Sequence, residues 1–169
     1  EAGAAHYEWR LKVEETSLSK PRHIEAPDWD GTVQLDKVVV LHSEQGLGDM
    51  VQFVRFALAA RAMVKQVIVE VPRPLVRIFT DSMPGITFIA KGETPPPFDL
   101  QAPLMSLMHR MKLRLDDLPA APVPDLKAQP ERVAKWAKQL ENGSRDRRIA
   151  LVWQGNPKAP VDAGRSATL

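Results

Sequence analysis

Residues 38–49 read VVVLHSEQGLGD: an apolar run stops at a Gly-x-Gly-Asp turn, and helical periodicity begins directly after it. Glycines let backbone N–H groups approach a ligand closely, and a helix that starts behind them adds the positive end of its dipole. This pattern predicts a strand–turn–helix corner that binds a ligand. Asp49 would repel a phosphate held in that corner, because like charges in a poorly solvated pocket destabilise each other. We therefore expect a loop that handles a proton or a hydroxyl group.

Composition indicates a globular chain. Its 169 residues, 44% of them hydrophobic, are enough for one sizeable core and a single domain. The 23 basic and 21 acidic residues are well mixed, and no basic stripe with interleaved aromatics predicts a nucleic-acid partner. The absence of cysteine excludes disulfides and thiolate metal sites and suits a cytoplasmic location. Without an apolar run of about 20 residues or a signal-peptide pattern, we expect a soluble protein with no membrane span.

Apolar runs and amphipathic stretches alternate through the middle of the chain. They predict strands at 38–42, 66–71 and 86–90, separated by helices at 47–64 and 74–82. A β-α-β-α-β order with right-handed crossovers predicts a Rossmann-like α/β fold, a doubly wound parallel sheet with flanking helices. Ligands of such folds bind at the carboxyl ends of the strands, which is where the glycine turn falls.

The flanking segments are less regular. We expect a short helix at 1–13 and a proline-bearing strap at 14–31 in which Trp29 packs. Further predictions are an edge strand at 98–101, a helix at 106–111 capped by Ser106, a helix from Pro130 that ends at Asn142-Gly143, and a last strand at 148–153. The chain opens on Glu1 inside a predicted helix and closes just after a new strand, so we expect a piece of a longer protein.

Asp49 is the leading candidate for chemistry, and two readings of it stay open. It falls in the first turn of its helix, where a carboxylate caps free N–H groups and also suits a general base. Gln52 and Arg55 continue the same polar arc at three-residue spacing, which is equally typical of a solvated helix face. His42 and Glu44 flank the turn as possible bases or orienting groups, although for His42 we favour a strand-end histidine satisfied by the backbone.

Other residue types add little chemistry. His6, His23 and His109 are scattered without ligand spacing, so we predict no metal site. Tryptophans at four positions are expected to pack rather than to stack on ligands, with the exception of the one before a glycine turn. They are Trp9, Trp29, Trp136 and, as the exception, Trp153.

A dinucleotide site is the obvious competitor. The turn supplies two of the three fingerprint glycines, and Glu70 ends the second strand, where a ribose hydroxyl would bind. Val51, however, occupies the position at which the helix needs a small residue to approach the sheet. Asp49 would also face the pyrophosphate, and both points count against this reading.

The run SEQGLGDMVQFVRF, residues 43–56, resembles the EQGLGD-x-x-QF-x-R-[YF] signature of bacterial TPR-containing glycosyltransferases, relatives of glycosyltransferase family 9 and of the O-GlcNAc transferase type. Shorter similarities extend over nearly the whole chain. They are Tyr7-Glu8-Trp9-Arg10, Pro27-x-Trp29-x-Gly31, Met83-Pro84-Gly85, Phe98-Asp99, Pro103-Leu104-Met105-Ser106-Leu107, the LVWQGNP run at 151–157, and Asp162-x-x-Arg165-Ser166.

The resemblance implies an inverting, metal-independent GT-B glycosyltransferase that needs no cofactor and uses a nucleotide sugar as donor substrate. Residues 1–31 would be the end of a TPR helix and a linker, and 32–169 the acceptor-side, N-terminal half, inactive without its C-terminal half. The acceptor would be a sugar or a protein, and the TPR region could bind a protein partner. Asp49 would be the base, and the substrate-binding residues would be Gln45, Gly46, Leu47, Gly48, Gln52, Gly155, Asn156, Asp162, Arg165 and Ser166.

Two departures from the family pattern keep alternatives open. Where the family reads Gly-Asn-Pro-x-His-x-Asn-Asp, this chain has GNPKAPVD at 155–162, so that Ala159 replaces the histidine. Met108 also stands where a proline commonly follows the Ser-Leu pair. The first alternative is therefore a non-catalytic, TPR-linked protein-interaction module, and a weaker one is a dinucleotide-dependent oxidoreductase.

Overall fold

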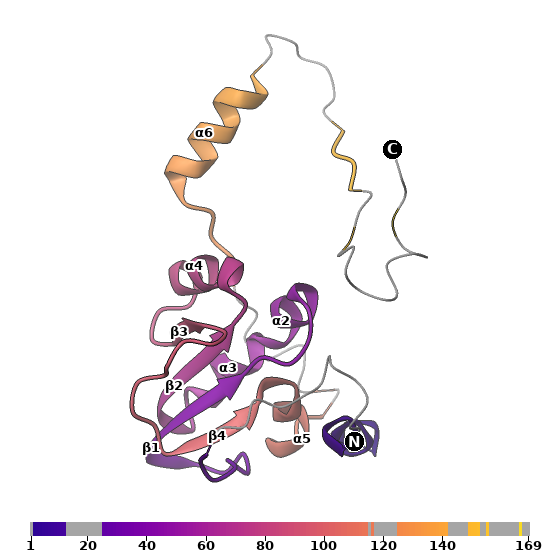
Figure 1. Ribbon diagram of the computed structural model, residues 1–169, viewed down its shortest axis with the longest axis vertical. Coiled ribbons are helices and arrows are strands. Elements are labelled where there is room, and N and C mark those ends of the chain that lie inside the picture. The colour runs from indigo at the N-terminus through magenta and orange to yellow at the C-terminus, as the bar shows by residue number, and fades with distance from the viewer. Residues whose placement is uncertain are drawn as a thin grey trace. The chain divides into compact units, whose positions relative to one another are not determined.

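The computed structural model describes residues 2–12, 25–114, 116, 125–141, 149–152, 155 and 166. The chain divides into two compact units, Glu1–Gln129 and Pro130–Leu169, and each is described by itself. The first unit has an α/β fold built on a four-stranded, all-parallel sheet in the order β3-β2-β1-β4 (Figure 1). The Rossmann-like fold predicted from the alternating pattern is thus confirmed, while the predicted domain boundary after residue 31 stays a prediction.

The four strands are β1 (Gln34–His42), β2 (Val64–Val71), β3 (Thr87–Ala90) and β4 (Leu100–Pro103). In the sheet register, Val39 lies opposite Val67 on one side and opposite Leu100 on the other. Successive residues Val39 and Val40 are both buried, as expected for a parallel strand covered on both faces. β4 forms the edge strand that the sequence predicted near 98–101.

The helix predicted at 47–64 is shorter than expected. Instead of one helix over 47–64, the chain forms α2 (Leu47–Phe53) and α3 (Arg55–Ala60), with an interruption at Val54. Residues 61–63 turn the chain back to the sheet, where the Met63 carbonyl accepts a hydrogen bond from the Gln34 N–H (2.7 Å). Val64, a β-branched residue, is buried in β2, so pairing with β1 outcompetes continued helix. α4 (Arg73–Ser82) follows the prediction closely, with a proline in its first turn.

The N-terminal segment consists of α1 (Ala2–Tyr7) and a 3₁₀ helix, η1 (Glu8–Lys12). The strap that follows is described from residue 25 and adds a parallel bridge to the sheet edge. Trp29 donates its backbone N–H to the Gln101 carbonyl (2.7 Å), and its indole N–H bonds the Thr32 carbonyl (2.9 Å). Trp29 is fully buried, as predicted for the strap.

After β4 the chain forms η2 (Leu104–Ser106) and α5 (Leu107–Arg110), which contacts α1 at the edge of the sheet (Figure 1). Ser106 occupies the N-cap position of α5, but its side chain makes no capping bond. The predicted cap is therefore wrong, because the Ser106 hydroxyl accepts a hydrogen bond from Arg10 instead (2.8 Å).

One apolar cluster joins the sheet to its helices. Side chains of one sheet face, including Val39, Leu41 and Val69, pack with Met50 of α2 and Phe79 of α4. α2, α3 and α4 therefore pack on the same face of the sheet. In the part of the chain that the structure describes, no helix is long and apolar enough to cross a membrane.

The second unit contains α6 (Pro130–Leu140), whose residues are all exposed. The strand predicted at 148–153 is wrong in its described part: residues 149–152 form no strand. Ile149 is 82% exposed and Val152 93%, so no neighbouring strand among the described residues covers this apolar stretch. The predicted helix stop at Asn142-Gly143 and the predicted exception Trp153 lie outside the described residues.

Candidate functional site

The glycine loop lies at the carboxyl end of β1, as predicted. Gly46 has an extended backbone (φ −76°, ψ 179°) and is the N-cap of α2. Asp49, at the third helical position, accepts a hydrogen bond from the Gly46 N–H through Oδ2 (3.0 Å). The capping reading of Asp49 is therefore confirmed, and the bond fixes the direction of its carboxylate.

Asp49 also faces a pocket of about 490 Å³, a size typical of small-ligand sites. The pocket is an open depression lined by α1, α2 and the segment around α5. Its lining residues are Gly3, Ala4, Tyr7, Asp49, Gln52, Phe53, Met105, Met108, Leu113 and Arg114. Asp49 and Gln52 thus share one pocket, where a carboxylate and an amide stand beside apolar side chains. A hydroxyl group bound there would donate its proton to the carboxylate.

The remaining loop residues differ in what they do. Gln45 donates from Nε2 to the Tyr7 hydroxyl (2.8 Å), so its side chain is held against α1. Leu47 is 49% exposed, and a side chain built at Gly48 would meet no atom within 4 Å. The loop therefore leaves open space beside Asp49 rather than filling it.

Glu44 proves to be a buried structural anchor that sequence reasoning did not identify. Its two carboxylate oxygens accept a forked pair of hydrogen bonds from Arg10, from Nε to Oε1 (3.0 Å) and from Nη2 to Oε2 (2.9 Å). The Glu44 side chain is fully buried and that of Arg10 is 8% exposed. Burial lowers the pKa of Arg10, but its bonds to Glu44 and Glu8 outweigh that effect and leave the pKa raised. The only sequence signal was a lone glutamate after a buried strand.

His42 is buried behind the loop, and it does not line the 490 Å³ pocket. Its Nε2 lies 2.9 Å from Gln101 Oε1, while Nδ1 has no hydrogen-bond partner among the described residues. The preferred prediction, a histidine satisfied by the backbone, is wrong, because the hydrogen bond of Nε2 is to a side-chain amide on β4. Burial lowers the pKa of His42, the bond to Gln101 opposing the effect only in part.

A second chain of bonds supports His42. The Gln101 amide also bonds Asp28, and Asp28 pairs with Arg110 of α5 (3.1 Å). Arg110 in turn donates to the Trp29 carbonyl (2.6 Å). The strap, β4 and α5 are thereby tied together on the side of β1 away from β2.

The residues weighed for a dinucleotide fit poorly. Glu70 is fully buried and accepts a bond from the Gly92 N–H (3.3 Å), so it does not reach a ribose hydroxyl. Val51, counted against a dinucleotide site because of its bulk, is 40% exposed and does not belong to the core cluster between helix and sheet. Met50 and Phe53 fill the contact between helix and sheet instead.

The exposure of the tryptophans and of Arg55 agrees only in part with the predictions. Among the described tryptophans only Trp29 packs as predicted, since Trp9 is 62% and Trp136 57% exposed. Arg55, on the predicted polar arc, is half-buried, with its guanidinium 6.0 Å from the centre of the Phe56 ring.

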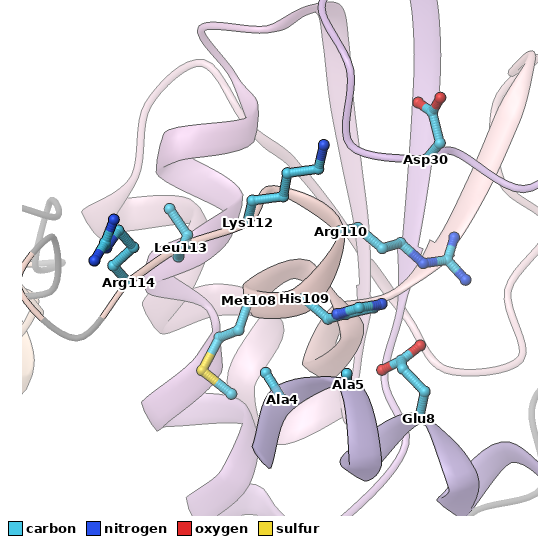
Figure 2. Close-up of a pocket in the computed structure, with 10 residues that line it drawn as sticks. All are labelled: Ala4, Ala5, Glu8, Asp30, Met108, His109, Arg110, Lys112, Leu113 and Arg114. Atoms are coloured by element: carbon cyan, nitrogen blue, oxygen red, sulfur yellow. The ribbon is translucent and has the colours of Figure 1, made fainter. Parts of the chain in front are cut away.

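A larger groove of about 780 Å³ adjoins the first pocket and shares Ala4, Met108, Leu113 and Arg114 with it. Figure 2 shows Ala4 and Ala5 of α1 facing Met108 and His109 of α5. Asp30 stands at its rim, and hydrogen bonds from the Thr32 hydroxyl and N–H lower its pKa. Asp49 does not line this groove, so the candidate chemistry belongs to the smaller pocket.

The second predicted rim is only partly described. The Gly155 N–H donates to Ser166 Oγ (2.8 Å), which brings together two of its members. Asn156, Asp162, Arg165 and the Ala159 replacement lie outside the described residues, so the rim as a whole stays a prediction. Among the described residues no group of three or more His, Asp or Glu side chains could hold a metal ion.

Comparisons with protein-family models, with curated proteins and with solved structures found no match to this chain.

Proposed function

We propose that this chain is the acceptor-side half of an inverting, metal-independent glycosyltransferase that uses a nucleotide-sugar donor. The proposal rests on the resemblance of the 43–56 run and on one observation above all: Asp49 and Gln52 line the same pocket beside the glycine loop. The parallel sheet supports it, because sites of such folds form at the carboxyl ends of the strands. In this proposal a second nucleotide-binding half supplies the donor site, and the transfer takes place in the cytoplasm.

In the proposed reaction, the acceptor hydroxyl donates a hydrogen bond to the Asp49 carboxylate. As its oxygen attacks the anomeric carbon of the donor sugar, the proton passes to Asp49 and the bond to the nucleotide diphosphate breaks on the opposite face. Attack opposite to the leaving group inverts the anomeric configuration. The Gly46 N–H holds the carboxylate in place, and Gln52 would bind a neighbouring acceptor group.

A non-catalytic interaction module is the second candidate. Two observations favour it: Asp49 already has a capping role, and Ala159 replaces the histidine of the resembling family. In that reading the loop retains its shape without chemistry, and the surface next to α1 binds a protein.

The test is donor turnover by the full-length gene product that contains these residues, across a panel of nucleotide sugars. Asp49→Asn keeps size and hydrogen bonding but removes the base, and Asp36→Asn is the matched control at an exposed carboxylate (77% exposed). We expect Asp49→Asn to lose about 10²–10⁴-fold in kcat with donor binding unchanged, and the control to keep full activity. A wild-type protein that neither binds nor consumes any nucleotide sugar would instead support the interaction module.

A further inference from the structure

We infer that Arg10 is the positioning residue of the glycine loop, so that the N-terminal segment α1–η1 holds Asp49 in its working orientation. This inference deepens the proposed function and rests on it for its kinetic consequences. Its structural part depends only on contacts between the N-terminal segment and the loop.

Arg10 uses its whole hydrogen-bonding capacity at one place. Two of its five N–H groups bond Glu44, and a third bonds Ser106 Oγ (2.8 Å). The other two bond the Tyr7 carbonyl (3.1 Å) and Glu8 Oε1 (2.9 Å). A guanidinium with five satisfied donors has one geometry, which an ammonium group cannot reproduce. Arg10 therefore fixes the distance and the angle between η1 and Glu44.

The fixed point lies close to the proposed base along the chain. Glu44 is two residues before Gly46, whose N–H bonds the Asp49 carboxylate (3.0 Å). Between them, Gln45 is held by the Tyr7 hydroxyl (2.8 Å), a second link to α1. Glu44, Gln45 and Gly46 are thus each anchored, the first two by the N-terminal segment and the third by Asp49 itself. A shift of α1–η1 would displace the loop and, with it, the carboxylate.

The ion pair between Arg10 and Glu44 also bonds a third segment that lines the pocket. Glu44 Oε2 accepts the Met105 N–H (3.3 Å), and Arg10 Nη2 donates to Ser106 Oγ. Met105 lines the same pocket as Asp49 and Gln52. One buried ion pair therefore joins three segments, residues 7–10, 44–49 and 105–106, around a single pocket.

The test combines two readouts on Arg10→Lys, which keeps the positive charge but loses the paired hydrogen bonds to Glu44. The first is the Gly46 amide proton signal in ¹⁵N–¹H spectra of this chain, because a hydrogen bond from an N–H to a carboxylate moves that signal downfield. We expect Arg10→Lys to move the signal upfield, toward its position in Asp49→Ala, which removes the bond. Arg110→Lys is the matched control, a similarly buried arginine (12% exposed) that ties the strap and does not touch the loop.

The second readout is kinetic, in the full-length gene product. We expect Arg10→Lys to lower kcat about tenfold to a hundredfold with donor KM unchanged, since a displaced base costs rate rather than donor binding. Tyr7→Phe, which removes only the hydroxyl link to Gln45, should lower kcat by less and serves if Arg10→Lys does not fold. An unchanged Gly46 signal in both folded variants would overturn the inference. A shifted Gly46 signal in a protein that turns over no donor would retain the inference and reject the proposed function.

Discussion

Replacing Gly31 with alanine should destabilise the first unit more than any other Gly→Ala change in its described part. Gly31 has a left-handed backbone (φ +85°), and an added Cβ would lie 2.9 Å from the Met111 N and closer still to the Arg110 carbonyl. A residue with a Cβ loses about 1–2 kcal/mol in this conformation, and displacing the end of α5 adds about 1–3 kcal/mol. We therefore expect a loss of about 2–5 kcal/mol from a total of about 5–15 kcal/mol.

Urea unfolding followed by circular dichroism measures the effect. With a slope of about 2 kcal/mol per molar urea, the midpoint should fall by about 1–2.5 M. Gly92→Ala is the matched control, because Gly92 has the same kind of backbone (φ +93°) but no atom within 4 Å of the added Cβ. Gly48→Ala, with neither constraint, should change the midpoint little. If Gly31→Ala and Gly92→Ala have equal midpoints, the close approach of the strap to α5 is not what requires glycine there.

The other predictions concern single contacts. Arg10→Met leaves the Glu44 carboxylate buried without its cation and should cost about 3–5 kcal/mol of unfolding free energy. The double variant Arg10→Met with Glu44→Leu should cost clearly less than the two single changes added together. Additive costs in urea unfolding would contradict the pairing. His42 has a lowered pKa in the folded state, so its contribution to stability is complete above about pH 6.5 and is lost as the pH falls toward the lowered value. His42→Gln should flatten that loss of stability between about pH 7 and pH 5, while the exposed His109→Gln should leave it unchanged. Asp49→Ala removes the bond to the Gly46 N–H and should cost about 0.5–2 kcal/mol; a stability equal to wild type would mean that the cap is not formed in solution.

Much of the fold could be predicted from local pattern. Alternating apolar runs and helical stretches have different periods, so the β-α-β-α-β order and the parallel sheet follow from the sequence. The boundaries were less accurate where tertiary contacts decided them. β1 extends back to Gln34 because Gln34 pairs with Val64, and α3 stops at Ala60 because Val64 is already in the sheet. This strand pairing cannot be predicted from the residues next to Gln34 or Val64 in the sequence.

The candidate site was predicted only in part, and for the same reason. Gly46 and Asp49 carry their own signal, since a glycine turn before a helix is a local pattern. Glu44 does not, because its partner Arg10 is 34 residues away in the sequence and Ser106 bonds Arg10 across 96 residues. A buried ion pair of this kind is defined by distances between segments, which spacing along the chain does not encode.

The strap and the Arg10 anchor bear on the order in which the chain folds. Trp29 bonds the backbone of Gln101, and Arg10 bonds Ser106. Both contacts join an early segment of the chain to residues that leave the ribosome much later. Contacts of such long separation form late and slowly. During synthesis the N-terminal segment can bond Glu44 and Gln45 early, but its contacts with Ser106 and α5 form only after β4 and η2 have emerged. A nascent chain stalled before residue 100 should expose Trp29 to solvent and lack the bond from Arg10 to Ser106.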